Sequence, residues 1–137
     1  MTKEIVASLD ELDRVVEYLS RHVASDCIIF LNGDLASGKT TLSSAIALSK
    51  GVEDSVTSPT FSLQQVYGDR LFHYDLYRIT NDEFFALGLH EELDREGWHL
   101  IEWADESLKS FLVNAGYNTA SISITPDGDS RNYSIEV

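Results

Sequence analysis

The chain has 137 residues, 43% of them apolar and 10% aromatic, which is typical of one globular domain that buries its own core. Its 23 acidic and 10 basic residues give a formal net charge of −13, which disfavours unassisted binding of DNA or RNA. The single cysteine, Cys27, excludes an intrachain disulfide, and no apolar run reaches the roughly 20 residues of a membrane span. Because Met1–Glu4 also lacks the features of a secretory signal, we expect a cytoplasmic protein in which residues 1–137 form one domain.

The N-terminal part is expected to form a strand, a helix and a second, buried strand. Residues Thr2–Ala7 alternate as a strand does, and Ser8 with Glu11 has the spacing of a capping box that opens a helix. The face that this helix is expected to bury consists of Leu9, Leu12, Val15, Val16 and Leu19. The continuous apolar run Cys27–Leu31 indicates a strand that is covered on both sides.

The middle of the chain combines a helix, a loop and a hairpin. A helix is expected from about Gly38 to Lys50, followed by a proline-containing loop over Ser55–Thr60. The runs Phe61–Tyr67 and Leu71–Tyr77 flank a glycine-containing turn, so they are expected to pair as a hairpin.

The C-terminal part mixes helices and strands. Thr80 and Glu83 have the spacing of a second capping box, which opens a helix expected to turn Phe84, Leu87 and Leu89 inward. The elements expected after it are a strand over Trp98–Trp103, a helix over Ala104–Asn114, and a hairpin of Tyr117–Thr125 with Asn132–Val137. This mixture of elements predicts an α/β sandwich.

A phosphate-binding motif lies between the buried strand and the helix that follows it. Gly33–Thr40 matches G-x-x-x-x-G-K-[ST], whose glycines let backbone amides form an anion-binding nest at a helix N-terminus. Lys39 is expected to reach the β- and γ-phosphates of ATP, and the Thr40 hydroxyl to bind Mg2+. The fold expected is therefore a P-loop NTPase-type three-layer sandwich with a mixed, largely parallel sheet and a C-terminal antiparallel hairpin.

The motif leaves more than one activity open. A GTPase would carry an [NT]-K-x-D motif, which the chain lacks, and a small-molecule kinase would need an arginine-rich lid that ten scattered basic residues do not provide. We favour an ATPase, and the alternatives are a nucleotide-binding interaction module and a small-molecule phosphotransferase.

Two acidic residues are candidates to complete the site. Glu102 ends the apolar run Leu100-Ile101, and Asp75 ends the run that begins at Leu71. A P-loop site needs a carboxylate at a neighbouring strand end to hold magnesium or to orient the attacking water. The spacing does not decide which of the two carboxylates has which task.

Four motifs occur in a fixed order: Gly33–Thr41, Thr57–Phe61, His73–Arg78 and Glu102-Trp103. With these motifs the chain resembles the TsaE family, also called YjeE, of bacterial P-loop ATPases that take part in the threonylcarbamoyladenosine modification of tRNA. The resemblance implies ATP and Mg2+ as cofactors and slow hydrolysis by the chain alone. It also implies stimulation by two partners, TsaB and TsaD, with tRNA reached only indirectly through their complex.

The resemblance implies roles for individual residues. Thr41 would lie against the α-phosphate, Thr60 of a switch loop near the γ-phosphate, and Trp103 beside the nucleotide. The implied catalytic residues are Glu102, Asp75, Lys39 and Thr60, and the implied metal ligands are Thr40, Glu102 and Asp75. The implied nucleotide-binding residues are Gly33, Asp34, Leu35, Ala36, Ser37, Gly38, Lys39, Thr40, Thr41 and Trp103.

Three further residues carry narrower expectations. Ala36 stands where the family usually has glycine, and if this position needs a positive φ, alanine costs about 1 kcal/mol or more and weakens nucleotide binding. His73 is expected to be a packed strand histidine with local hydrogen bonds. Arg78 is expected either to sense phosphate charge or to form a salt bridge.

Overall fold

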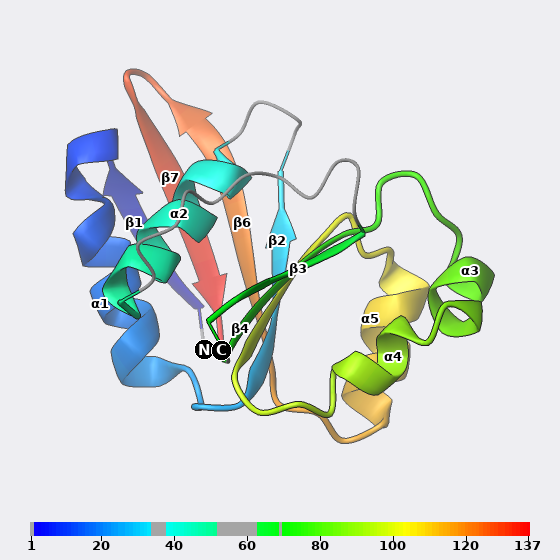
Figure 1. Ribbon diagram of the computed structural model, residues 1–137. Coiled ribbons are helices and arrows are strands. Elements are labelled where there is room, and N and C mark those ends of the chain that lie inside the picture. The colour runs from blue at the N-terminus through cyan, green and yellow to red at the C-terminus, as the bar shows by residue number, and fades with distance from the viewer. Residues whose placement is uncertain (1, 34–37, 52–62, 69) are drawn as a thin grey trace.

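A computed structural model describes residues 2–33, 38–51, 63–68 and 70–137 (Figure 1). The expectations for Asp34, Leu35, Ala36 and Ser37 lie outside the described residues. The same holds for the Thr57–Phe61 switch loop with Thr60. Among the described residues, no helix is long and apolar enough to cross a membrane.

One sheet of seven strands, in the order β1-β7-β6-β2-β5-β4-β3, forms the centre of the molecule. Its strands are β1 (Thr2–Ala7), β2 (Cys27–Asn32), β3 (Gln64–Tyr67), β4 (Leu71–Asp75), β5 (Trp98–Glu102), β6 (Thr119–Asp127) and β7 (Ser130–Glu136). The central strands β6, β2, β5 and β4 are parallel, whereas β3, β7 and β1 pair antiparallel. The predicted mixed sheet with a C-terminal antiparallel hairpin is confirmed.

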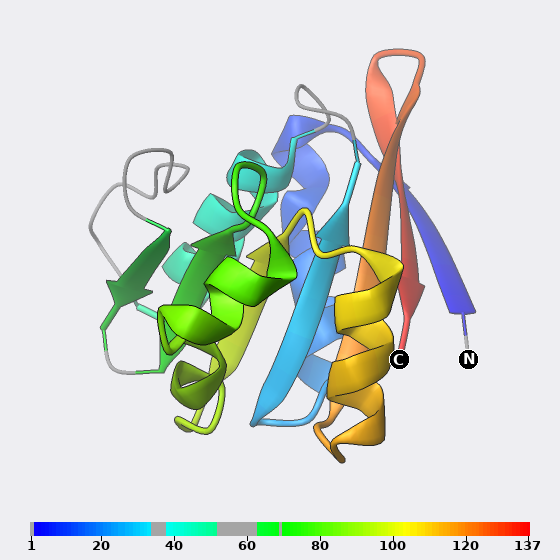
Figure 2. The same cartoon turned by 90° about the vertical axis from the view of Figure 1, so that its right-hand side faces the viewer.

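Helices cover both faces of this sheet (Figures 1 and 2). The helical elements are the 3-10 turn η1 (Leu9–Glu11), α1 (Leu12–His22), α2 (Lys39–Ser49), α3 (Asn81–Ala86), α4 (Leu89–Glu92) and α5 (Glu106–Asn114). Helices α1 and α2 pack on one face and α3, α4 and α5 on the other, which confirms the predicted three layers.

The sequence of β2 is continuously apolar because both faces of this strand are buried. Successive side chains of a strand point to opposite faces, so Cys27, Ile29 and Leu31 join the core under α1 and α2. Ile28 and Phe30 join the core under α3, α4 and α5. With helices over both faces, no position of this strand is left for a polar side chain until Asn32.

Two apolar residues that we expected inside are exposed. Leu9 is 65% exposed because the 3-10 turn η1 precedes α1 and rotates this position off the buried face. Leu87 is 59% exposed because α3 ends at Ala86 and the chain then turns through Gly88 at φ 76°. The predicted burial of Phe84 and Leu89 is confirmed.

The two helix starts in the C-terminal half follow from their capping side chains. The predicted capping box forms at Thr80, whose Oγ1 accepts the amide of Glu83 at 3.1 Å while Glu83 Oε1 accepts the amide of Thr80 at 3.0 Å. Helix α5 begins at Glu106, two residues later than expected, because Asp105 accepts the amide of Leu108 at 2.8 Å. This amide holds the pKa of the Asp105 carboxyl below its usual value.

Candidate functional site

The carboxyl ends of three parallel strands meet at one edge of the sheet. The strand register places Leu31 of β2 beside Glu102 of β5, and Glu102 beside Asp75 of β4. Neighbouring strands lie roughly 4.8 Å apart, so both predicted carboxylates stand within two strand spacings of the phosphate-binding segment. In open α/β sheets this edge is where ligands bind.

The phosphate-binding segment joins β2 to α2 through two glycines. Gly33 follows β2, and Gly38 precedes α2 with φ 103°, a left-handed conformation that side chains with a Cβ rarely adopt. The carbonyl oxygen of Gly38 accepts the amide of Leu42 at 2.9 Å, which starts the helix. The N-terminal amides of α2 therefore face the same sheet edge as the two carboxylates.

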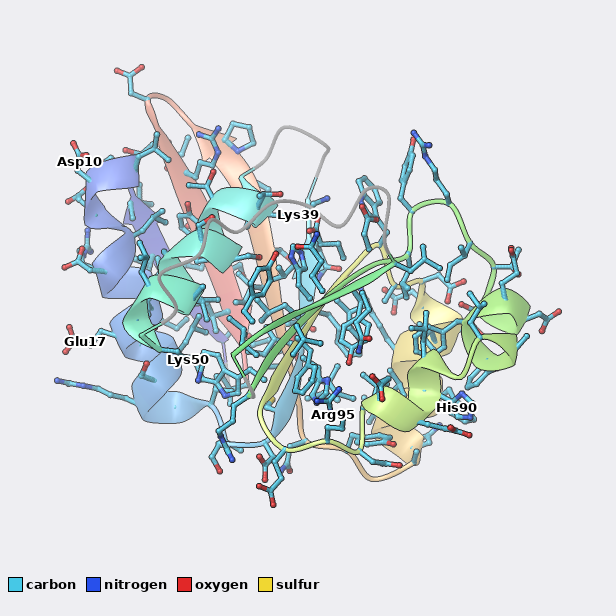
Figure 3. The ribbon with its side chains drawn as sticks, viewed as in Figure 1. Asp10, Glu17, Lys39, Lys50, His90 and Arg95 are labelled. Carbon is cyan, nitrogen blue, oxygen red and sulfur yellow. The ribbon has the colours of Figure 1, made fainter. Side chains whose placement is uncertain are left out.

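Lys39 is a nearly buried cation at this edge. Its side chain is only 4% exposed, and Figure 3 shows the residue at the start of α2, beside the ends of the central strands. Its Nζ donates to the carbonyl oxygen of Gly33 at 2.7 Å and lies 4.0 Å from Glu102 Oε1. It also lies 3.7 Å from the centroid of the Trp103 ring. A carboxylate and an aromatic face thus compensate a nearly buried ammonium group.

Glu102 is held from two sides. It is buried, its Oε1 faces Lys39, and its Oε2 lies 2.5 Å from Nε2 of the fully buried His73. A histidine was expected to pack locally in β4, but its partner is a carboxylate on the neighbouring strand. The spacing of the residues in the sequence does not predict the His73–Glu102 pair, because the pair depends on the register of β4 on β5.

The other ring nitrogen of His73 is unusual. Nδ1 is buried and has no hydrogen-bond partner among the residues that the structure describes. If Nε2–H donates to the carboxylate of Glu102, Nδ1 is an unprotonated acceptor that faces no donor. A buried acceptor without a partner costs about 1–3 kcal/mol, which offsets part of the stability that the His73–Glu102 contact contributes.

Trp103 has a strained backbone. Its φ of 66° is the one positive value among the described residues other than glycine, and such a conformation costs about 1–2 kcal/mol. The turn directs the indole over Lys39 and within 4.9 Å, between ring centroids, of Tyr77. The position of the Trp103 ring beside Lys39 therefore depends on a backbone conformation that the sequence does not predict.

The remaining predicted residues lie around this centre. Asp75 accepts the amide of Tyr77 at 3.0 Å, while Thr40 and the exposed Thr41 stand in the first turn of α2. Arg78 is exposed and forms no ion pair with any described residue, so the salt-bridge interpretation finds no support.

The side chains at this edge of the sheet include oxygen donors that could bind magnesium. In the described part of the chain, no three His, Cys, Asp or Glu side chains form a ready-made metal cage. Magnesium at nucleotide sites keeps several waters and binds one or two carboxylates together with phosphate oxygens. Thr40 in the first turn of α2 and Asp75 at the end of β4 carry oxygen donors of the kind that such an ion binds.

Two other buried polar groups lie away from this edge. His99 Nε2 lies 2.7 Å from the carbonyl oxygen of Arg95, and its Nδ1 lies 2.6 Å from the hydroxyl of Tyr74. Burial lowers the pKa of His99, so the ring is neutral and structural at pH 7. Burial raises the pKa of the Cys27 thiol to about 11, so this side chain is a small buried hydrophobe.

Replacement of His73 by phenylalanine is expected to destabilise the fold by about 3 kcal/mol, because a buried carboxylate loses one of its partners. Urea unfolding followed by tryptophan fluorescence measures this loss. The matched control is His73→Gln, whose amide can still donate to Glu102 and which should lose clearly less. Equal stability of His73→Phe and the wild type would show that the contact does not support Glu102.

Comparison with known proteins gives one consistent result. The family described as "Threonylcarbamoyl adenosine biosynthesis protein TsaE" matches residues 6–133. The tRNA threonylcarbamoyladenosine biosynthesis protein TsaE of Treponema pallidum is 33% identical over 117 residues, which are 81% of this chain and 83% of that protein. The protein of the same name from Bacillus subtilis is 35% identical over 113 residues, 74% of this chain and 71% of that protein.

A solved structure agrees at the level of the fold. The crystal structure of Bacillus subtilis YdiB superposes with a TM-score of 0.63 at 23% identity. The match covers 98% of this chain and 86% of that one, so the whole arrangement of sheet and helices is shared.

Proposed function

This chain belongs to the TsaE family of threonylcarbamoyl adenosine biosynthesis proteins, and we propose that it is a magnesium-dependent ATPase whose turnover is coupled to a complex of TsaB-like and TsaD-like proteins. The observation that carries the ATPase proposal is the placement of Lys39 between the end of β2 and the carboxylate of Glu102. Threonylcarbamoyl transfer itself takes place on the partners, and tRNA is reached only through them.

Nucleotide binding follows from the loop and the start of α2. The phosphates lie on the amides between Gly33 and Thr41, where the helix dipole adds positive potential. The ammonium group of Lys39 exchanges the carbonyl oxygen of Gly33 for β- and γ-phosphate oxygens. Thr40 would hold magnesium through its hydroxyl, and Thr41 would contact the α-phosphate. Magnesium, when bound, neutralises charge on the β- and γ-phosphates.

Glu102 and Asp75 have different roles in the proposed hydrolysis. Glu102 is buried beside Lys39, so it lies where the γ-phosphate ends and orients the attacking water. Asp75 is less buried and would hold magnesium through the waters that this ion keeps. Water adds to the γ-phosphorus as the bond to the ADP oxygen breaks. One proton of this water stays on inorganic phosphate, and the other passes through Glu102 to solvent. Lys39 stabilises the charge that develops on the departing oxygen.

The state of Glu102 gives a reason for slow turnover by the chain alone. The residue is only 3% exposed and its carboxylate lies between His73 and Lys39, so an attacking water reaches it only after a neighbour moves. We assign that movement to nucleotide and partner binding, together with the Thr57–Phe61 loop and Thr60 near the γ-phosphate. The role of this loop rests on the family resemblance.

The test is ADP release from magnesium ATP by the purified chain, alone and with TsaB-like and TsaD-like proteins. We expect weak release alone and strong release with both partners, with Lys39→Ala as the inactive control. Nucleotide binding without any stimulation by the partners would overturn the coupled ATPase. It would favour an interaction module in which ATP occupancy is the signal.

A further inference from the structure

A second cationic side chain lies against the phosphate-binding segment. Arg131 is the second residue of β7, where it stands opposite Ala7 of β1 and Pro126 of β6. A Cβ built on Gly38 would lie 3.2 Å from Arg131 Nε and 3.4 Å from its Cδ. The side chain of Arg131 is therefore packed on the backbone that starts α2.

The hairpin explains how a residue so late in the chain reaches this place. Strand β6 runs parallel to β2, so the tip that joins β6 to β7 rises at the same edge as the start of α2 (Figures 1 and 2). Arg131, Tyr133 and Ile135 alternate along β7, and the latter two belong to the core under α1 and α2. Arg131 therefore lies on the α2 side of the sheet, two residues along β7 from the first of these core residues.

Lys39 and Arg131 lie toward different sides of the end of β2. The ammonium group of Lys39 turns toward β5, where Glu102 and Trp103 contact it. In the sheet β5 lies on one side of β2, and β6 and β7 lie on the other. A nucleotide whose γ-phosphate lies at Lys39 and Glu102 must extend its remaining parts away from β5, and β6 and β7 border that direction.

We propose that Arg131 is a nucleotide-binding residue whose guanidinium contacts the α-phosphate and ribose end of the nucleotide. The proposal deepens the proposed function, because it requires that the Gly33–Thr41 loop binds ATP. Arginine suits this place, since its planar fork donates several hydrogen bonds to phosphate oxygens. The contact with Arg131 also favours glycine at position 38, in addition to the positive φ, because a Cβ there would displace the arginine side chain.

Nucleotide titration of three arginine variants tests the proposal. Arg131→Met keeps an unbranched stem that can pack on Gly38 but removes the guanidinium, whereas Arg131→Lys keeps a positive charge. Arg21→Met removes an equal charge from the surface of α1, where Arg21 pairs with Glu17. Affinities for magnesium ATP and for ADP are measured by calorimetry, with melting temperatures of the nucleotide-free proteins as the check on folding.

We expect Arg131→Met to weaken ATP and ADP binding alike, by about tenfold, which matches the loss of a charge-assisted contact. Arg131→Lys should recover part of this loss, and Arg21→Met should bind as the wild type does. Unchanged affinity of Arg131→Met for both nucleotides would overturn the proposal and leave Arg131 as a packing residue. A loss confined to ATP would also overturn it, because the contact would then be to the γ-phosphate. If the wild type itself bound no nucleotide, the proposed function would fail first.

Discussion

Replacement of Lys39 by alanine is expected to weaken the binding of magnesium ATP by about 100-fold or more and to abolish hydrolysis. The reason is that Lys39 is a nearly buried cation at the end of β2, where it donates to the carbonyl oxygen of Gly33 and lies 4.0 Å from Glu102. Two charge-assisted contacts to phosphate oxygens contribute about 3–4 kcal/mol together, which corresponds to this change in affinity. Calorimetric titration with magnesium ATP measures the binding, and partner-stimulated ADP release measures the turnover.

A matched control for this variant lies at the other end of the same helix. Lys50 also stands over a tryptophan, with its Nζ 3.9 Å from the ring centroid of Trp98, and Figure 3 shows it far from Lys39 along α2. Lys50→Ala removes the same charge and a similar cation–π contact, so its ATP affinity should equal that of the wild type. A Lys39→Ala protein that binds ATP as tightly as Lys50→Ala would contradict the assignment of the loop as the nucleotide site.

Replacement of Glu102 by glutamine is expected to lower turnover by about 100- to 1,000-fold while ATP affinity changes little. The amide keeps the shape of the side chain and can still accept a hydrogen bond from His73, but it can no longer take part in proton transfer from water. Single-turnover hydrolysis in the presence of the partners separates this chemical step from binding and from product release.

Asp75→Asn is the companion variant that separates the two carboxylates. If Asp75 holds the waters of the metal, its replacement should raise the magnesium concentration needed for half-maximal turnover. Saturating magnesium should then restore most of the activity, whereas it should not rescue Glu102→Gln. Full activity of Glu102→Gln together with a dead Asp75→Asn would exchange the two assignments.

Several features of this protein are determined by short stretches of its sequence. The buried strand over Cys27–Leu31, the helix that begins at Lys39 and the Thr80 capping box all form as expected. Each depends on a backbone conformation or a hydrogen bond within a few residues, so a local pattern is sufficient to specify it. The expectations for Leu9 and Leu87 were wrong because they depended on where a helix begins or ends, which periodicity alone does not decide.

The sequence also named the chemical groups of the candidate site, since Lys39, Asp75 and Glu102 stand at the ends of expected elements. It did not show which of these groups meet. The contact of His73 with Glu102 depends on the register of β4 on β5, and the approach of Arg131 to Gly38 depends on the return of β7 beside β6. Strand neighbours and registers are selected by burial of apolar side chains from the whole chain in one core. Because that selection joins residues far apart in the sequence, only the tertiary structure decided the geometry of this site.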